Sequence, residues 1–391
     1  MKKIVKIFFW LVLAFVAYII MAYVFKQAII YYYEQRDKKY DWAAEYQDTK
    51  IKDKYKIVFI GTSGVIADKE AAYRIISACK RLGWETHVFE NIDDNQERIK
   101  AINPDFIFTN NWKTEIGIRN SSLKYKAYAL LPHPIATYFG GFFNFYPKFK
   151  EKKFPELKFF DGFVISTPQI GLFKNYIEAQ GHKFYGFQGY SAVQYQEYVE
   201  VEPKQIIYMG INWDKKRKSS KFGKVFKNLA ENKGAVFYGA AESWQNLVGD
   251  AYQGYFEGEG SAVIEILRKH GISLIIHSNQ HIKSGAPSAR AFEAAASGAI
   301  AISDQHPFLI ETFGDNFLYI DTSKSAESIT EQISKHLEWI RKNPDKVKEM
   351  TRNAYDIFIT NYTLERLLIN LAHMHEKILL DDKLIESQVG F

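Results

Sequence analysis

Residues 285–304 combine a helix signal with two side chains that can bind a ligand. Ser288 is a favourable N-cap residue, and Gly298 marks the end of a helix before a short apolar strand. Arg290 and Glu293 are the charged residues of this otherwise small and apolar helix, and their spacing puts them on one face. They form either a surface ion pair or a ligand site at the helix N-terminus, where free backbone N–H groups favour an anion.

Polar residues at the ends of other predicted strands are further candidates. Gly61 and Gly64 belong to a glycine-rich turn after an apolar strand, although without the GxGxxG spacing of a dinucleotide site. Asn111 and Trp112 place amide groups beside an aromatic ring, a combination that suits the face of a sugar. His133 lies between two prolines in a loop after a strand, which makes it either a general base or a histidine in a rigid turn.

The second half of the chain adds a basic segment and a polar loop. Within the basic segment we expect Arg217 and Lys218 to reach a phosphate, unless the segment is a solvated charged face. His277 and Asn279 lie where a predicted strand leads into the helix that carries Glu293, and they resemble the rim of a ligand site. The histidines at 277, 281 and 306 have no carboxylate or cysteine at a compelling metal-binding spacing, so we expect no metal.

Alternating strands and helices must position these residues. Compact apolar strands at 56–60, 105–109, 205–209 and 272–277 alternate with helical stretches, which is typical of doubly wound α/β domains. Ligands bind beyond the carboxyl ends of such strands, where the candidate loops fall. The predicted organisation is an anchor and linker at 1–54, a first Rossmann-like domain at 55–190, a linker at 191–204, and a second Rossmann-like domain with terminal helices at 205–391.

The composition limits the classes of protein that this chain can form. A length of 391 residues suits two domains, and a hydrophobic content of 47% supplies sizeable cores. The single cysteine, Cys79, excludes an internal disulfide and a thiolate metal cluster. The net charge of +6 fits an anionic ligand or membrane surface and is not a nucleic-acid signal, so we expect no nucleic-acid partner.

Residues 7–25 form an uncharged apolar run bounded by lysines, long enough as a helix to cross a bilayer. A cleaved signal peptide has a shorter core and a small-residue cleavage site, whereas bulky tyrosines follow at 31–33. We therefore expect one uncleaved span. Residues 142–153 mix aromatic side chains with lysines and are either a second contact with the membrane or ordinary core with solvated lysines.

The order of motifs in the second half points to a family. PSARAFEAAASGAIAISD is followed by FGDNFLYID, then by a helix that ends HLEWIRKNPDKVKEM, and then by NYTLERLL. This order resembles the C-terminal half of GT-B glycosyltransferases, in particular the bacterial group-1 and CgeB-like branch, over about residues 205–368. The resemblance implies two Rossmann-like domains facing a cleft, with the acceptor in the first and a nucleotide-diphospho-sugar donor in the second.

The resemblance also implies roles for residues of the 285–304 stretch. Glu293 would contact the ribose hydroxyls of the donor, Arg290 a phosphate or sugar, and Ser288 and Ala289 would offer backbone N–H groups to the diphosphate. Many retaining members carry a second glutamate eight positions before the first, where this chain has Gly285. The choice between retaining and inverting chemistry therefore stays open.

The implied chemistry needs neither a metal nor a cofactor, since positive groups and a helix N-terminus stabilise the leaving diphosphate. For an inverting reaction a base must deprotonate the acceptor hydroxyl, and His133 is the first candidate, with Asp68 second. The sequence thus predicts a membrane-anchored glycosyltransferase for a cell-surface glycan, glycolipid or glycoprotein acceptor, with its catalytic part in the cytoplasm, where bacterial nucleotide-sugars are found. The alternatives are a sugar-nucleotide epimerase, which needs no tether, and a degenerate GT-B domain that acts as a membrane-bound scaffold or binding module.

Overall fold

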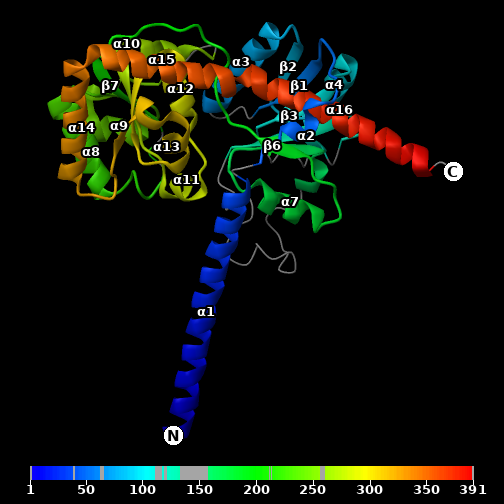
Figure 1. Ribbon diagram of the computed structural model, residues 1–391, viewed down its shortest axis with the longest axis horizontal. Coiled ribbons are helices and arrows are strands. Elements are labelled where there is room, and N and C mark those ends of the chain that lie inside the picture. Colours follow the sequence, from blue (N-terminus) through cyan, green and yellow to red (C-terminus); the bar gives the residue numbers. More distant parts are fainter. Residues whose placement is uncertain are drawn as a thin grey trace.

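Two parallel β-sheets with helices around them form the body of the protein, and one long helix projects away from it (Figure 1). The computed structural model describes residues 2–37, 40–61, 66–110, 117–118, 121–132, 157–210, 212, 214–255 and 260–389. All strand pairings within both sheets are parallel. The α/β class and the two Rossmann-like sheets predicted from the sequence are therefore confirmed.

The first sheet has the strand order β2-β1-β3-β4-β5-β6. Its inner strands β1, β3, β4 and β5 are buried and mainly apolar in their central part, as expected for a parallel sheet that is covered on both faces, whereas the edge strand β2 is partly exposed. The strands are β1 (Lys56–Ile60), β2 (Glu85–Phe89), β3 (Phe106–Thr109), β4 (Lys126–Leu131), β5 (Gly162–Ile165) and β6 (Gly186–Gln188). Among the described residues, this body includes the helices α2 (Ala44–Gln47), α3 (Ile66–Arg81), α4 (Gln96–Ile102) and α7 (Ile170–Glu178), with short helical turns η1 (Asp93–Asn95) and η5 (Leu157–Phe159).

The second sheet has the order β11-β10-β9-β7-β8, so the chain leaves β7 in one direction and returns on its other side. Such a switch point, here between β7 and β9, is where open α/β sheets bind ligands. The strands are β7 (Gln205–Met209), β8 (Val236–Tyr238), β9 (Gly271–Ile275), β10 (Ile300–Asp304) and β11 (Leu318–Ile320). The helices are α8 (Ser220–Lys233), α9 (Ala241–Val248), α10 (Ala262–His270), α11 (Asn279–Ser284), α12 (Ala289–Ser297), α13 (Pro307–Phe313), α14 (Ala326–Lys342) and α15 (Pro344–Asn361), with turns η6 (Gly249–Ala251) and η7 (Gly314–Asn316).

Helix α12 packs closely between α10 and α15 because its side chains are small. Its alanines after Ala289 are buried, and the ring of Phe292 packs against Tyr190 and Tyr362. Gly298 ends the helix in a left-handed conformation with φ of 80°. A Cβ atom at this position would lie 2.2 Å from the carbonyl oxygen of Val199, so the turn from α12 into β10 requires glycine.

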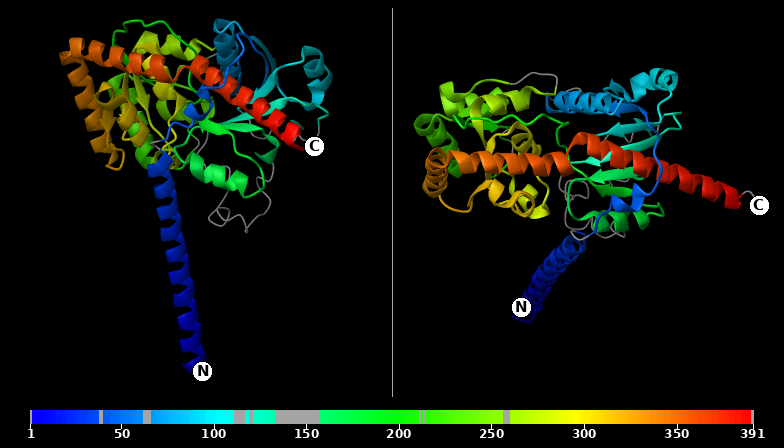
Figure 2. Two further views of the ribbon diagram at one scale, coloured as in Figure 1. Left: turned by 45° about the vertical axis from the view of Figure 1, so that its right-hand side comes forward. Right: turned by 45° about the horizontal axis from the view of Figure 1, so that its top comes forward.

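The last helix, α16 (Leu364–Val389), crosses from the second body to the first (Figure 2). Leu368, Leu371 and Met374 lie in the core of the first body, and the Nδ1 of His375 lies 2.7 Å from the hydroxyl of Tyr128. The prediction that residues 205–391 form one domain is therefore wrong for α16. An apolar stripe on a helix shows that the helix is buried, but it does not show which sheet covers it.

Helix α1 (Lys2–Asp37) is the element that projects from the body. Its part Lys6–Ile29 has a mean hydropathy of 2.5 and is long and apolar enough to cross a membrane, although a signal sequence has the same properties. At its other end, the Oδ2 of Asp37 accepts a hydrogen bond of 2.6 Å from the backbone N–H of Gly171 at the start of α7. This contact joins α1 to the first body. Residues 142–153, the second predicted membrane contact, lie outside the described residues.

Candidate functional site

The predicted charge pair on α12 is present, and it is buried. Ser288 caps the helix, since its hydroxyl accepts a hydrogen bond of 3.3 Å from the backbone N–H of Arg290. The Nη1 of Arg290 donates to the Oε2 of Glu293. The side chain of Glu293 is 2% exposed, whereas that of Arg290 is 23% exposed. The alternative of a surface ion pair is therefore wrong.

A second arginine reaches Glu293 from the first body. Arg74, on α3, places its Nη2 2.8 Å from the Oε1 of Glu293, and the Arg74 side chain is 7% exposed. Burial raises the pKa of Glu293, but the positive charges of Arg290 and Arg74 outweigh it, so the pKa lies below its ordinary value. Glu293 is thus an ionised carboxylate at the contact between the two bodies. The sequence holds no local signal for Arg74, because only domain packing brings it to Glu293.

His277 connects the start of α12 to the second sheet. It follows β9 at the switch point, and its buried ring has Nδ1 2.7 Å from the Oδ1 of Asp304. Its Nε2 accepts a hydrogen bond of 3.1 Å from the backbone N–H of Ser288. Because a backbone N–H can only donate, Nδ1 must carry the proton. The expectation that Ser288 offers its N–H to a diphosphate is therefore corrected, since His277 already binds that group; Ala289 is the first residue of α12.

Asp304, at the end of β10, is the anion of this network. Its Oδ2 accepts hydrogen bonds from the Nζ of Lys216 at 2.9 Å and from the backbone N–H of His277 at 2.8 Å. Burial raises the pKa of Asp304, but His277 and Lys216 act against it, and the net effect lowers the pKa to about 2. Lys216 belongs to the basic segment identified in the sequence and lies immediately before the two residues that were expected to matter.

The other predicted residues of the second body lie apart from this network. Arg217 pairs with Asp214 in its own loop, and its Nη1 lies 3.4 Å from the hydroxyl of Tyr208. Lys218 is exposed, and so is Asn279, the first residue of α11. Within the described part of the chain, no hydrogen bond or ion pair joins these three side chains to Glu293 or His277. The structure thus favours Lys216 over Arg217 and Lys218 as the basic residue at the switch point.

Two further histidines hold the loop that leads into α12. The Nε2 of His306 and the Nδ1 of His281 lie 3.1 and 3.2 Å from the carbonyl oxygen of Ala286. Burial lowers the pKa of His306 to about 3, so its ring is neutral. The rings of His306 and His277 are 4.3 Å apart, centre to centre. Across the described ranges, no group of histidine, cysteine, aspartate and glutamate side chains is suited to a metal ion.

Most predicted site residues of the first body fall in stretches that the structure does not describe. Gly61 is described, and it follows β1 with its N–H donating to the carbonyl of Phe89 at 3.0 Å. Asp68 lies on α3, the helix that also carries Arg74. Outside the described residues lie Gly64, Asn111, Trp112 and His133. Their roles, and that of Asp68, stay predictions.

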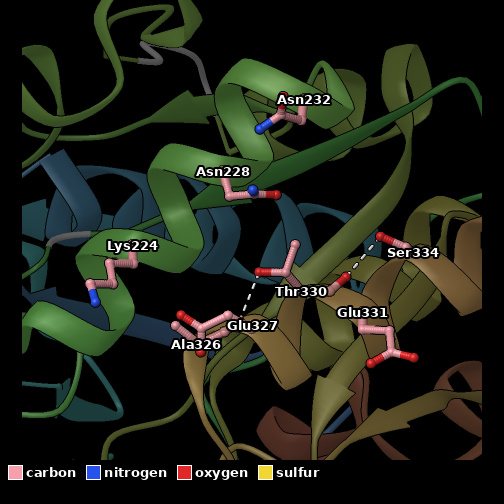
Figure 3. A pocket seen from close by; sticks show the side chains of 8 residues that line it. All are labelled: Lys224, Asn228, Asn232, Ala326, Glu327, Thr330, Glu331 and Ser334. Carbon is pink, nitrogen blue, oxygen red and sulfur yellow. Dashed lines mark hydrogen bonds between the residues drawn. The ribbon is translucent and has the colours of Figure 1, made fainter.

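A polar groove lies between α8 and α14 (Figure 3). The hydroxyls of Thr330 and Ser334 donate to the carbonyls of Ala326 and Thr330 at 2.9 and 2.8 Å, and so are bound within their own helix. None of the predicted site residues lines the groove, so we assign no function to it. Its lining consists of Lys224, Asn228, Asn232, Ala326, Glu327, Thr330, Glu331 and Ser334.

Comparison with known proteins finds a likeness in the part of the chain that carries this site. Residues 217–372, which include Glu293, His277 and Asp304, match a family model described as glycosyl transferase-like. No curated protein matches the chain.

Solved structures extend the likeness to both bodies. Sucrose-phosphate synthase from Thermosynechococcus elongatus is similar with a TM-score of 0.54 at 11% identity, over 83% of this chain and 99% of that one. The α,α-trehalose 6-phosphate synthase from Burkholderia multivorans is similar with a TM-score of 0.50 at 10% identity, over 85% of this chain and 99% of that one. At such identities the likeness concerns the fold.

Proposed function

We propose that this protein, which has the GT-B fold and a glycosyl transferase-like C-terminal half, is a membrane-anchored glycosyltransferase that uses a nucleotide-diphospho-sugar. The observation that carries the proposal is the environment of Glu293. A buried, ionised carboxylate on α12 lies at the contact between the two bodies, on the helix whose start His277 binds at the switch point of the second sheet. A carboxylate in that position is suited to accept hydrogen bonds from the two hydroxyls of a ribose.

The reaction follows from the charges around this helix. The acceptor oxygen attacks the anomeric carbon, the bond from that carbon to the diphosphate breaks, and the diphosphate leaves with the electron pair. Arg290 and the N-terminus of α12, beginning at Ala289, would offset its negative charge. The acceptor proton passes to a base, for which we propose His133, with Asp68 as the second candidate.

The position of Gly285 supports a reaction that does not use a second glutamate there. Gly285 ends α11 in a left-handed conformation with φ of 67°. A glutamate side chain at this position would strain the backbone.

The position of helix α1 supports the proposal that the acceptor lies at a membrane surface. The apolar part of α1 lies outside the body, and its end is joined to α7 through Asp37 and Gly171. A chain held in this way stays near lipid-linked or surface-bound glycans, which is why we propose a cell-surface glycan, glycolipid or glycoprotein as acceptor. The catalytic part would lie in the cytoplasm with the donor.

The first experiment compares UDP, GDP and ADP with their 2′-deoxy forms in calorimetric titrations of the full chain in detergent micelles. We expect the ribonucleotide to bind about tenfold or more tightly than its deoxy form, because a hydrogen bond to a charged group is lost. Glu293→Gln should remove most of this difference. Glu365→Gln, which changes another buried glutamate that faces an arginine, is the control. If no nucleotide binds the wild-type chain, the proposal is refuted.

One observation favours a second candidate, a degenerate GT-B domain that binds but does not catalyse. Both carboxylate oxygens of Glu293 are already engaged by Arg74 and Arg290. A scaffold protein that no longer binds a donor would tolerate a Glu293 carboxylate that is permanently paired with these two arginines. Hydrolysis of a bound nucleotide-sugar in the absence of acceptor would support the enzyme, whereas tight nucleotide binding without any turnover would support the scaffold.

A further inference from the structure

Four charged side chains meet where α3 of the first body faces α12 of the second. Glu70 and Arg74 lie one turn apart on α3, and Arg290 and Glu293 lie one turn apart on α12. Glu70, Arg74 and Glu293 are each buried, and the backbone of Arg74 lies close to Gly260 of the second body. The glycosyl transfer proposed above makes no use of Glu70 or Arg74.

Arg74 covers the Glu293 carboxylate, which is the group that the donor is proposed to bind. The Oε1 of Glu293 bonds to Arg74, its Oε2 bonds to Arg290, and the residue is 1% exposed. Arg290 belongs to the same helix as Glu293 and can stay when a ligand enters. Arg74 comes from the opposite body, so its guanidinium is the group that a ribose must displace to reach Oε1.

A second acceptor for Arg74 lies nearby. The Oε2 of Glu70 is 3.9 Å from the Nε of Arg74, and neither of these two atoms has a hydrogen-bond partner among the described residues. Burial raises the pKa of the Glu70 carboxyl more than Arg74 and the backbone N–H of Gly260 lower it, so the anion is only partly compensated where it stands. A small movement of the guanidinium towards Glu70 would replace one buried ion pair by another, and so avoids leaving Arg74 as an unpaired buried charge.

We infer, on the basis of the proposed function, that Arg74 sets the donor affinity. Its guanidinium pairs with Glu293 while the donor is absent. It moves to Glu70 when the ribose hydroxyls bind Glu293 in its place. Only molecules in which Arg74 does not cover Glu293 can bind the ribose. The apparent donor affinity is therefore the intrinsic affinity multiplied by the fraction of molecules in which Glu293 is not covered. The same exchange releases a direct ion pair between the two bodies. A second link between them, from the Nε2 of Gln169 to the carbonyl of Ser284 at 3.1 Å, does not involve α12 and can remain.

The test uses calorimetric titration of the full chain in detergent micelles with whichever of UDP, GDP and ADP binds best. Arg74→Met keeps the unbranched apolar stem of the side chain, removes the competing guanidinium and leaves Glu293 paired with Arg290. We expect the dissociation constant to fall by about fivefold or more, the size of an ordinary coupling between sites. Arg81→Met is the matched control, because Arg81 lies on the same helix and faces Glu365 instead. It should leave the affinity unchanged.

Glu70→Gln should change the nucleotide affinity in the opposite direction. Without the anion at position 70, Arg74 has no second charged partner and stays on Glu293, so the nucleotide should bind about fivefold more weakly. The double variant Arg74→Met/Glu70→Gln should behave like Arg74→Met alone. General damage to the contact would weaken binding in all three variants, and this pattern distinguishes it from the exchange.

The outcomes separate the inference from the proposed function. Tighter binding by Arg74→Met together with weaker binding by Glu70→Gln supports the exchange. Unchanged or weaker binding by Arg74→Met, with a wild-type chain that binds nucleotide, overturns the exchange and leaves the proposed function standing. If the wild-type chain binds no nucleotide, the proposed function fails and the inference fails with it.

Discussion

The Nδ1 of His277 lies 2.7 Å from the Oδ1 of Asp304, and this contact joins the ends of two neighbouring strands of the second sheet. The other nitrogen of the same ring accepts the N–H of Ser288 at the start of α12. A single imidazole therefore fixes the helix that carries Glu293 relative to β9 and β10. Lys216 completes the arrangement by neutralising Asp304.

The buried pair of Lys216 and Asp304 should be strongly coupled. Asp304→Asn leaves the Lys216 ammonium, 7% exposed, without its anion, and we expect a loss of stability of about 3–5 kcal/mol. Adding Lys216→Met should recover part of this loss, because the unpaired charge is then removed. Thermal unfolding followed by circular dichroism measures both variants. Losses that simply add would contradict the predicted coupling.

His306 should make the protein sensitive to acid. Its folded-state pKa of about 3 lies below its ordinary value of 6.5, so the unfolded chain binds the proton more readily. The stability contribution is complete above pH 6.5 and is lost as the pH falls towards 3. At pH 4.5 the loss should be about 2–3 kcal/mol. His306→Gln should reduce the difference between unfolding midpoints at pH 7 and pH 4.5, whereas His182→Gln, at an exposed histidine, should not.

His133 should affect turnover far more than donor binding. If it is the base, His133→Ala should lower turnover by about a hundredfold or more, because general base catalysis contributes at least that much. The nucleotide dissociation constant should stay close to that of the wild type. Initial rates and calorimetry on the same preparation give both values. Turnover near that of the wild type would remove His133 from the mechanism and direct attention to Asp68.

Alanine substitutions at Gly298 and Gly181 should distinguish the stability cost of a left-handed backbone from the cost of a steric clash. Both have left-handed backbones, with φ of 80° and 82°. An alanine at 181 meets no atom within 4 Å, so Gly181→Ala should cost only about 1 kcal/mol of strain. At 298 the added methyl group would lie 2.2 Å from the carbonyl of Val199, so Gly298→Ala should cost clearly more, about 3 kcal/mol. Equal shifts of the unfolding midpoint would contradict the close packing.

Much of the fold is readable from local patterns. The apolar strands at 56–60 and 205–209, the cap at Ser288 and the stop at Gly298 all lie where the sequence predicts them. These features depend on residues a few positions apart, so the sequence is enough to find them. The exception is α16: its apolar stripe is equally compatible with either sheet, and its packing on the first was not predicted.

The sequence by itself determined which residues of the second body are chemically unusual, including Glu293, Arg290 and His277, because their types stand out against small and apolar neighbours. Only the tertiary structure decided how they are used. Arg74 reaches Glu293 from the other body, and Lys216, rather than its two basic neighbours, enters the network of His277 and Asp304. The physical reason is that a buried charge needs a partner, and the partner is chosen by which elements pack together rather than by distance along the chain.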